Sequence, residues 1–172
     1  KQIVFLKGFY VDRFEVSNRR YKQFIDSVGA IAPVYWERDS FPKGKENHPV
    51  VWVNWYDAAN FCSWAGKRLP TEKEWERVGK GPQGLNYPWG AVFKIDNANL
   101  ASRAGSKNTV GAVGKYPSGA SVEGVHDLIG NVWEWTADNY APYSGNDYQA
   151  LEYGDGSKTL RGASASYIGH FS

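Results

Sequence analysis

Two carboxylates and a carboxamide lie close together in one short stretch of the chain. Glu134 stands between two tryptophans in the run Gly-Asn-Val-Trp-Glu-Trp, which also holds Asn131, and Asp127 precedes the run by three residues. Carboxylate oxygens and backbone carbonyls are the ligands that calcium selects, and Gly130 lets the backbone bend closely around an ion. The stretch predicts a calcium site. Hydrogen bonding within a buried turn is the alternative role for Glu134 and Asn131.

Three further motifs precede this run. They are HPVVWVNWYDAA from His48, WAGKRLPTEKEWE from Trp64 and YPWG from Tyr87. In this order the four motifs resemble the formylglycine-generating enzyme, or sulfatase-modifying factor, family over about residues 9–164. The resemblance implies an α+β fold class, namely the C-type lectin-like fold of the formylglycine-generating enzyme subtype, with few short helices and strands and high irregular content. A shared fold does not by itself imply the family's chemistry.

Length and composition bound the class of protein. The 172 residues are 42% hydrophobic, 22% charged and 16% aromatic, which excludes a disordered chain and fits one domain built from packed, turn-rich segments. We therefore expect a single formylglycine-generating-enzyme-type domain over residues 1–172. Family members begin with a glycine-rich strand and close with a strand ending Gly-Phe-Arg-Cys or similar. The sequence matches neither, so we expect the domain to lack its N-terminal first strand and its C-terminal closing strand.

Charge and cysteine content restrict the partners. A net charge of +2, with lysine and arginine spread along the chain, predicts no nucleic-acid partner, and no apolar run is long enough for membrane insertion. The single cysteine, Cys62, excludes an intramolecular disulfide and is interpreted as a buried small hydrophobe. The cellular location stays open, because a targeting signal can be removed from a mature chain.

Capping signals predict three helices. They cover residues 18–27 after Ser17, residues 55–65 after Asn54, and a short helix that begins at Thr71 with a capping box. Residues 80–126 are expected to be mostly irregular. Alternating or β-rich patterns predict strands at Ile3–Leu6, Phe9–Val16, Asn131–Thr136 and Lys158–Arg161.

The resemblance implies two calcium sites in this family. At the second, Asp127 and Glu134 would supply side-chain oxygens, and Gly130 and Val132 would supply backbone carbonyls. At the first, Asn99 and the Leu100 carbonyl match. The acidic loop that follows in the family is shortened here to residues 101–108 and contains no carboxylate. Turn capping is therefore the alternative role for Asn99.

The family's oxidase chemistry requires two cysteines that bind copper(I). Tyr167 and Ser172 occupy the two corresponding positions, and neither side chain replaces a thiolate as a ligand for a soft ion. Copper is therefore not expected, and the assignment leans away from an enzyme. Two alternatives remain: an oxidase whose cysteines lie outside these residues, and an accessory domain of a non-haem iron sulfoxide synthase. His48 is interpreted as a hydrogen-bonded histidine, and His126 and His170 are isolated in sequence.

The C-terminal stretch suggests ligand binding. Its residues resemble the mutated patch of non-catalytic family members, such as the variable proteins of diversity-generating retroelements. Small polar and aromatic residues also make adaptable recognition surfaces in antibodies. The predicted ligand-binding residues are Ala163, Ala165, Ser166, Tyr167, Ile168, Gly169, His170 and Phe171. The expected partner is a protein or other macromolecular ligand, and a drifted loop without this role is the alternative.

Overall fold

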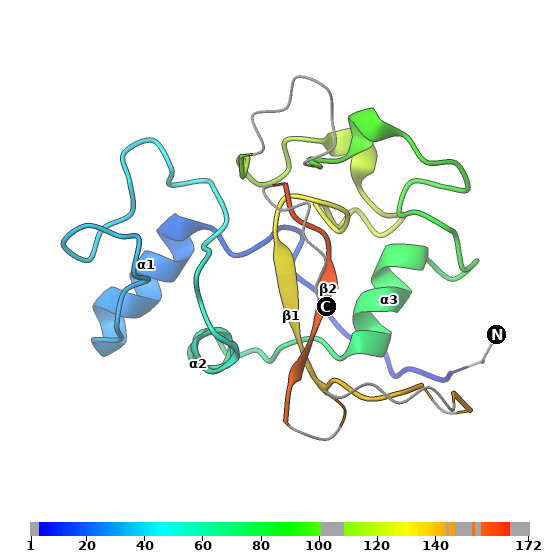
Figure 1. Cartoon of the computed structure of the whole chain (residues 1–172), viewed down its shortest axis with the longest axis horizontal. Helices are drawn as coiled ribbons and strands as arrows, with labels where there is room; N and C mark the ends of the chain where they lie inside the picture. The colour runs from blue at the N-terminus through cyan, green and yellow to red at the C-terminus, as the bar shows by residue number, and fades with distance from the viewer. Residues whose placement is uncertain (1–3, 101–108, 144, 147–152, 154–155, 166–172) are drawn as a thin grey trace.

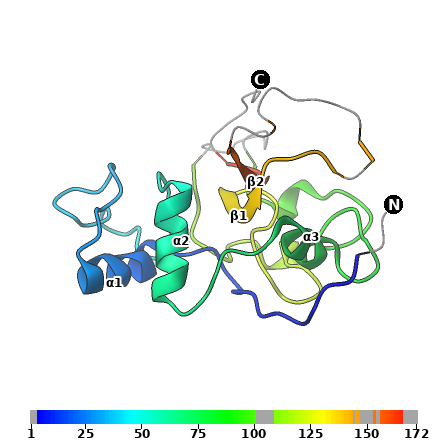
Figure 2. The ribbon, with the colours of Figure 1, turned by 90° about the horizontal axis from the view of Figure 1, so that it is seen from below.

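The computed structural model describes all residues except 1–3, 101–108, 144, 147–152, 154–155 and 166–172 (Figure 1). The described elements are α1 (Asn18–Val28), α2 (Trp55–Trp64), α3 (Glu72–Lys80), the 3₁₀ turns η1 (Ile95–Asn97) and η2 (Pro117–Gly119), β1 (Trp133–Asn139) and β2 (Lys158–Gly162). Figures 1 and 2 show the sheet in the middle, with α1 and α2 on one side and α3 on the other. Short helices and a short antiparallel sheet confirm the α+β class.

All three helices begin at the predicted caps. The Ser17 side chain accepts the Arg20 N–H, and the left-handed Gly29 closes α1 by donating its N–H to the Ile25 carbonyl. Asn54 and Asp57 form a reciprocal capping box at the start of α2. Thr71 and Glu74 form the same box at α3. Local capping chemistry therefore sets where each helix starts.

An ion pair supports the α3 capping box. Both Glu74 carboxylate oxygens accept hydrogen bonds from the Arg68 guanidinium, each at 2.7 Å. These bonds lower the pKa of Glu74 to about 2, against the opposing effect of burial. The segment before α3 is thereby fixed to the first turn of the helix.

Two separate hydrophobic clusters hold the helices in place. The first joins α1 and α2 through Tyr21, Phe24, Ile25, Trp36 and Phe61. Cys62 packs partly buried against this cluster, and burial raises the pKa of its thiol. The second cluster lies against α3 and is formed by Trp75, Val78, Val125 and Leu128, with Phe9 packed on it. The irregular segment around residue 125 is thus held by α3.

The strands β1 and β2 pair antiparallel, with Trp133 opposite Gly162 and Trp135 opposite Leu160. The predicted strand at residues 131–136 begins two residues later than expected. Asn131 adopts a left-handed backbone conformation with φ of 63°, which cannot continue a strand. The later start leaves residues 127–132 free to form a tight loop before the sheet.

Segments other than β2 also hydrogen-bond to β1. The Trp55 indole donates to the Thr136 carbonyl at 2.8 Å, and the Ala137 N–H donates to the Pro70 carbonyl at 2.8 Å. The Trp135 indole donates to the Val53 carbonyl at 3.0 Å. These bonds attach the entries of α2 and α3 to β1, so both helices are positioned relative to the 127–132 loop.

Neither strand predicted near the N-terminus is formed by its described residues, 4–6 and 9–16. Residues 4–16 take part in no strand, although the backbone from residue 9 follows an irregular path past the sheet and between the helices (Figure 2). A strand exists only when a neighbouring strand accepts its hydrogen bonds, and the described residues supply no such neighbour here. The composition of this segment is typical of strands, but the prediction that it forms paired strands is wrong.

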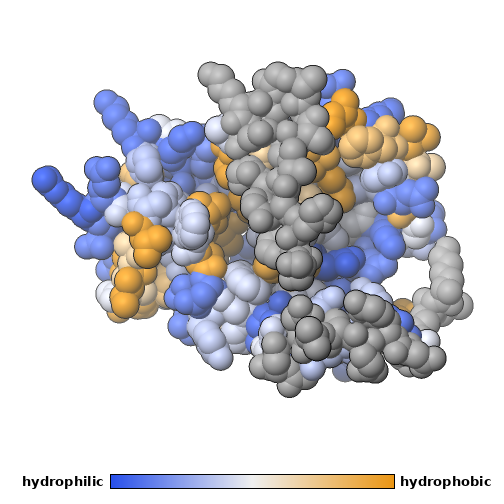
Figure 3. Space-filling model, viewed as in Figure 1, coloured by the Kyte–Doolittle hydropathy of each residue, from blue (hydrophilic) through white to orange (hydrophobic). Residues whose placement is uncertain are grey.

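The surface carries apolar residues in separate places. Figure 3 shows apolar patches set between polar residues on one face. Highly exposed examples include Phe5, Ile31, Val34, Trp52 and Tyr56. Within the described part of the chain, no helix combines the length and apolar character needed to cross a bilayer.

Candidate functional site

The loop before β1 brings the predicted calcium-binding stretch against Asn99. Gly130 forms a bridge with Asn99, and the Asn131 N–H donates to the Asn99 carbonyl at 2.9 Å. A Cβ atom on Gly130 would lie 2.4 Å from that carbonyl oxygen, and φ at Gly130 is 93°. Only glycine allows this approach. The two predicted calcium segments are therefore in contact through their backbones.

Asn131 lies at the centre of a buried hydrogen-bond network. Its side-chain oxygen accepts from the Asn99 amide at 2.9 Å and from the Gly111 N–H at 2.8 Å. Its side-chain nitrogen donates to Glu15 Oε2 at 2.6 Å. With only 2% of its surface exposed, Asn131 connects three segments that are far apart in the sequence. This is the hydrogen-bonding role that the sequence offered as the alternative for Asn131.

Asp127 and Glu134 are each held by one donor. Asp127 Oδ2 accepts the Gly114 N–H at 2.6 Å, and Glu134 Oε2 accepts the Trp75 indole N–H of α3 at 2.9 Å. Burial raises the pKa of Asp127. Burial, with a smaller contribution from the charge of Asp127, raises the pKa of Glu134 to about 7. Only His126 acts on Asp127 with a positive charge, and no ion pair with a lysine or arginine is made by either carboxylate within the described part of the chain, so the pair suits a positively charged ligand.

Glu15 is a third carboxylate in this region, and the sequence analysis did not identify it. Burial raises the pKa of Glu15 to about 9, and the charges of Glu134 and Asp127 raise it further. Its Oε1 atom is buried without a hydrogen-bond partner. In an alternating pattern over residues 9–16 Glu15 shares a face with Phe9 and Val11, and an acidic residue beside these apolar positions was the available signal.

The donor set fits calcium in part. In the described part of the chain, no three side chains of His, Cys, Asp or Glu are placed to hold one metal ion together. The predicted second site needs only two carboxylates, with the Gly130 and Val132 carbonyls completing it. Two poorly compensated carboxylates beside a tightly bent loop are consistent with that set.

The predicted first calcium site is less complete. The Asn99 side-chain nitrogen donates to the Thr109 carbonyl at 3.1 Å and to Asn131. This arrangement matches the turn-stabilising role offered as the alternative. Leu100 follows directly, and residues 101–108, which would complete the site, lie outside the described residues.

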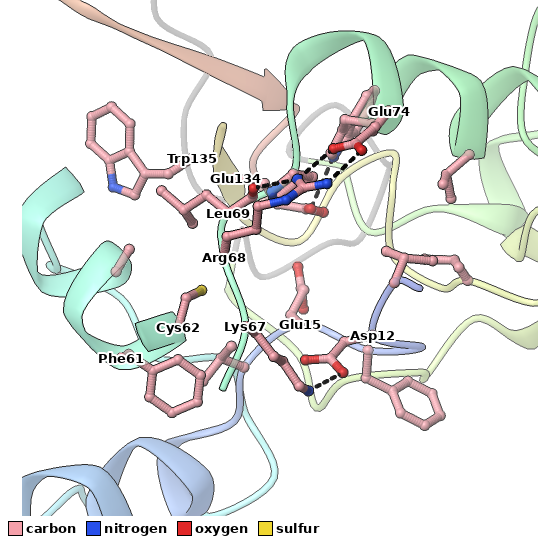
Figure 4. A pocket seen from close by; sticks show the side chains of 18 of the residues that line it. Asp12, Glu15, Phe61, Cys62, Lys67, Arg68, Leu69, Glu74, Glu134 and Trp135 are labelled. Atoms are coloured by element: carbon pink, nitrogen blue, oxygen red, sulfur yellow. Dashed lines mark hydrogen bonds and ion pairs between the residues drawn. The ribbon is translucent and has the colours of Figure 1, made fainter. Parts of the chain in front are cut away.

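A cavity of about 530 Å³ lies beside Glu15 and Glu134, between the N-terminal segment, α2, α3 and β1. Figure 4 shows Glu15 extending toward this space from below, with Arg68 and Glu74 paired above it and Lys67 paired with Asp12. Cys62 also lines the cavity. Cavities of this size accommodate small ligands or a few side chains.

The histidines do not form a common site. His48 Nε2 lies 3.2 Å from Lys45 Nζ, and burial together with Lys45 lowers the pKa of His48. His126 is 6% exposed, packs against the Phe14 ring and has no hydrogen-bond partner at either ring nitrogen among the described residues. His170 lies outside the described residues.

Part of the predicted ligand-binding stretch is described. Ala163 is partly exposed directly after β2. Ala165 is fully buried, and its N–H donates to the Asn131 carbonyl at 3.0 Å. The Ala165 side chain is packed inside in this structure, and the predicted ligand contact at this residue stays a prediction. Ser166, Tyr167, Ile168, Gly169, His170, Phe171 and Ser172 lie outside the described residues.

A protein family and several known relatives match most of this chain. Residues 1–170 match the family described as "Sulfatase-modifying factor enzyme 1-like domain". The chain is 31% identical over 186 residues to the formylglycine-generating enzyme of Mus musculus, covering 78% of this chain and 50% of the relative. It is 39% identical over 153 residues to the inactive C-alpha-formylglycine-generating enzyme 2 of Bos taurus, covering 76% of this chain and 44% of the relative. The chain thus spans about half the length of these relatives.

A solved structure has a similar fold. Treponema denticola variable protein 1 superposes with a TM-score of 0.61 at 21% sequence identity, over 89% of this chain and 73% of that chain. At this identity the likeness concerns the fold alone. An active enzyme, an inactive relative and a variable protein therefore share features with these 172 residues.

Proposed function

Because the chain belongs to the family of sulfatase-modifying factor enzyme 1-like domains, we propose that it is a non-catalytic ligand-binding scaffold of C-type lectin fold. Residues 1–172 form its single domain, and the segment around residues 163–171 presents its binding surface to a protein or other macromolecule. The fold likeness to a variable protein supports this assignment.

The observation that carries the proposal is that the one cysteine of this sequence, Cys62, is partly buried and stands outside the family's cysteine positions. The sequence contains one cysteine, and Tyr167 and Ser172 stand where the resemblance places the family's cysteine pair. Cys62 packs against the α1–α2 cluster, and burial raises the pKa of its thiol. A thiolate is the form that binds copper(I), so a raised pKa disfavours that chemistry. These residues therefore supply no site for a copper oxidase.

The binding surface begins at a well-fixed point. Gly162 pairs with Trp133 at the end of the sheet, and the buried Ala165 attaches the following residues to Asn131. A recognition segment needs such an anchor, because ordering a loose segment on binding reduces affinity. Ala165 thus serves the proposed surface as its anchor, and the residues after it supply the contacts.

Selection from a library tests the surface. Randomising residues 166–171 in the displayed chain is expected to give binders of hen-egg lysozyme while the unfolding temperature changes by less than about 4 °C. A matched library on exposed α1 positions, including Arg19 and Gln23, serves as the control and should give fewer binders. Binding is measured by fluorescence titration of purified variants.

Three results would contradict the scaffold assignment. Loss of folding in most members of the 166–171 library would show that this segment belongs to the core. Submicromolar copper(I) binding by the unmodified chain, measured against a competing chelator, would show a soft-metal site that Cys62 alone does not explain. Equal numbers of binders from both libraries would also count against a dedicated surface.

Calcium is proposed as a structural ion at Asp127 and Glu134, with the Gly130 and Val132 carbonyls. Its charge would offset the two buried carboxylates and fix the loop before β1. After chelator treatment, titration with calcium is expected to give saturable heat and a higher unfolding temperature. Glu134→Gln should weaken the affinity at least about tenfold, because one charged ligand is lost. The exposed Glu37→Gln is the control, and equal affinity in both variants would remove Glu134 from the site.

A further inference from the structure

Two opposite charges face each other across the sheet without pairing. The register of β1 and β2 places Glu134 directly opposite Arg161. Side chains at such positions leave the same face of an antiparallel pair, with Cβ atoms about 5 Å apart, and opposite charges there attract each other. Within the described part of the chain, however, Arg161 forms its ion pairs with residues of α3, and Glu134 accepts the Trp75 indole N–H. Something therefore keeps the two charges apart.

The Trp75 ring contacts both charged groups with different parts of its surface. Its N–H edge donates to Glu134 Oε2 at 2.9 Å, and the Arg161 guanidinium lies over its face, 5.1 Å from the ring centre. Helix α3, which carries Trp75, lies beside both strands (Figure 1). A Cβ atom on Gly162 would lie 3.8 Å from the ring, so the ring reaches β2 next to Arg161. Only 8% of Trp75 is exposed, so the ring is packed in place against both strands.

The ion pairs of Arg161 with α3 are long. Its Nη1 atom lies 3.5 Å from Glu72 Oε1, and its Nη2 atom lies 3.6 Å from Glu76 Oε2. Charge-assisted hydrogen bonds are shorter than this. The Nε atom of Arg161 is buried and has no hydrogen-bond partner among the described residues. Arg161 therefore keeps donor capacity that a nearby carboxylate could use, and the Trp75 ring stands in the way of Glu134.

The separation matters for any cation that binds at Glu134. A guanidinium contacts both oxygens of a carboxylate and offsets its charge, so it competes with a metal ion for the same two atoms. With Arg161 held over the ring, Glu134 makes one hydrogen bond, to a neutral donor, and keeps its negative charge uncompensated by lysine or arginine in the described part of the chain. The carboxylate is thereby left available.

We propose that Trp75 is a positioning residue that keeps Arg161 from pairing with Glu134 and so reserves this carboxylate for a bound cation. The inference rests on the calcium site proposed above for the identity of the cation, whereas the separation of the two charges does not depend on it. Trp75 acts through Glu134 and does not itself bind the ion.

Calcium affinities of the full chain and its variants test this role. Trp75→Leu removes the ring and is expected to weaken calcium binding at least about tenfold, because Arg161 then pairs with Glu134. Adding Arg161→Gln to Trp75→Leu should restore the affinity to within about threefold of the wild type, whereas Arg161→Gln alone should change it by less than about threefold. Titration calorimetry after chelator treatment measures the affinities, at a pH above the Glu134 pKa of about 7.

Two controls separate the ring from its surroundings. Val78→Ala opens a cavity in the same hydrophobic cluster and leaves the ring, so its calcium affinity should stay within about twofold of the wild type. The double variant Glu72→Gln, Glu76→Gln removes the α3 partners of Arg161 and should stay within about threefold, because the ring still blocks the pairing. Both glutamates are partly exposed, so this variant is expected to fold even where Trp75→Leu does not.

A measurement in chelator follows Arg161 without any metal ion. The Nε–Hε resonance of Arg161 in the ¹⁵N NMR spectrum is assigned by its loss in Arg161→Gln. Adding Glu134→Gln should shift this resonance clearly more in the Trp75→Leu background than in the wild type, because only there does the guanidinium contact the carboxylate. The spectrum thus reports the new ion pair directly.

Several outcomes would overturn the role of Trp75. They are an unchanged calcium affinity in Trp75→Leu, a loss that Arg161→Gln does not relieve, and an Arg161 resonance that responds to Glu134→Gln equally in both backgrounds. A tenfold loss in the double glutamate variant would assign the separation to α3 instead of the ring. A wild-type chain that binds no calcium would contradict the calcium site, and the resonance comparison would still decide whether Trp75 separates the two charges.

Discussion

Replacing Gly130 by alanine is expected to lower the free energy of unfolding by about 4 kcal/mol, a large share of what a domain of this size has. Two penalties act together. Alanine is strained at φ of 93°, and its Cβ would lie 2.4 Å from the Asn99 carbonyl oxygen and 2.8 Å from the carbonyl carbon. Both atoms are backbone, so they cannot rotate away. The loop must therefore separate from Asn99, which breaks the hydrogen bond from Asn131 to Asn99.

Gly29→Ala separates strain from contact. Gly29 also has positive φ, 66°, but a Cβ there would meet no atom within 4 Å. Gly29→Ala should lower the free energy of unfolding by about 1 kcal/mol, the usual difference between glycine and alanine in such a cap. Urea unfolding of both variants measures the two values. Equal losses would show that Asn99 moves aside easily and that the contact with Gly130 does not hold the loop.

Asn131→Asp is expected to lower the free energy of unfolding by about 3 kcal/mol, although it replaces only the amide nitrogen of the side chain by an oxygen. The new oxygen would face Glu15 Oε2, which now accepts a hydrogen bond at 2.6 Å. Burial raises the pKa of Glu15 to about 9, so the loss is expected above that pH, where Glu15 is ionised and two acceptors would meet in a buried place. The bonds from Asn99 and Gly111 to the other side-chain oxygen stay possible. The loss therefore reports on the contact with Glu15, and urea unfolding in chelator measures it without interference from metal ions.

A second substitution should restore the pairing. Combining Glu15→Gln with Asn131→Asp places an amide donor opposite the new carboxylate, and the coupling between the two sites is expected to be 1–3 kcal/mol in favour of the double variant. Asn60→Asp, an exposed change of the same kind on α2, should alter stability by less than about 0.5 kcal/mol. If the losses in unfolding free energy are additive in the double variant, Glu15 and Asn131 do not interact energetically, and this contact does not stabilise the network.

Local chemistry explains which elements the sequence predicted well. The three helix starts at Ser17, Asn54 and Thr71 depend on side chains that bond to their own backbone within three residues. Such signals do not require knowledge of the rest of the fold. The strand at β1 was predicted with the wrong start, because Asn131 adopts positive φ in response to distant partners. Nothing adjacent to Asn131 in the sequence indicates those partners.

The same distinction holds in the candidate site. Asp127 and Glu134 were found because they lie within eight residues of each other in one motif. Glu15 is 116 residues from Asn131, and only folding brings them together. The contact between Gly130 and Asn99 is of the same long-range kind. Sequence spacing identifies carboxylates along a loop, whereas the donors that hydrogen-bond to them, Gly114 and Trp75, come from other parts of the chain.

The hydrogen bonds that other segments make to β1 have a consequence for aggregation. The Thr136 carbonyl and the Ala137 N–H belong to one peptide group and point to opposite sides of the strand, and they are already bonded to Trp55 and Pro70. A strand from another molecule would have to displace one of these partners before it could pair with this part of β1 on either side. The protection ends if the segments before α2 and α3 detach, so partial unfolding of those segments is the event that exposes this part of β1 to other chains.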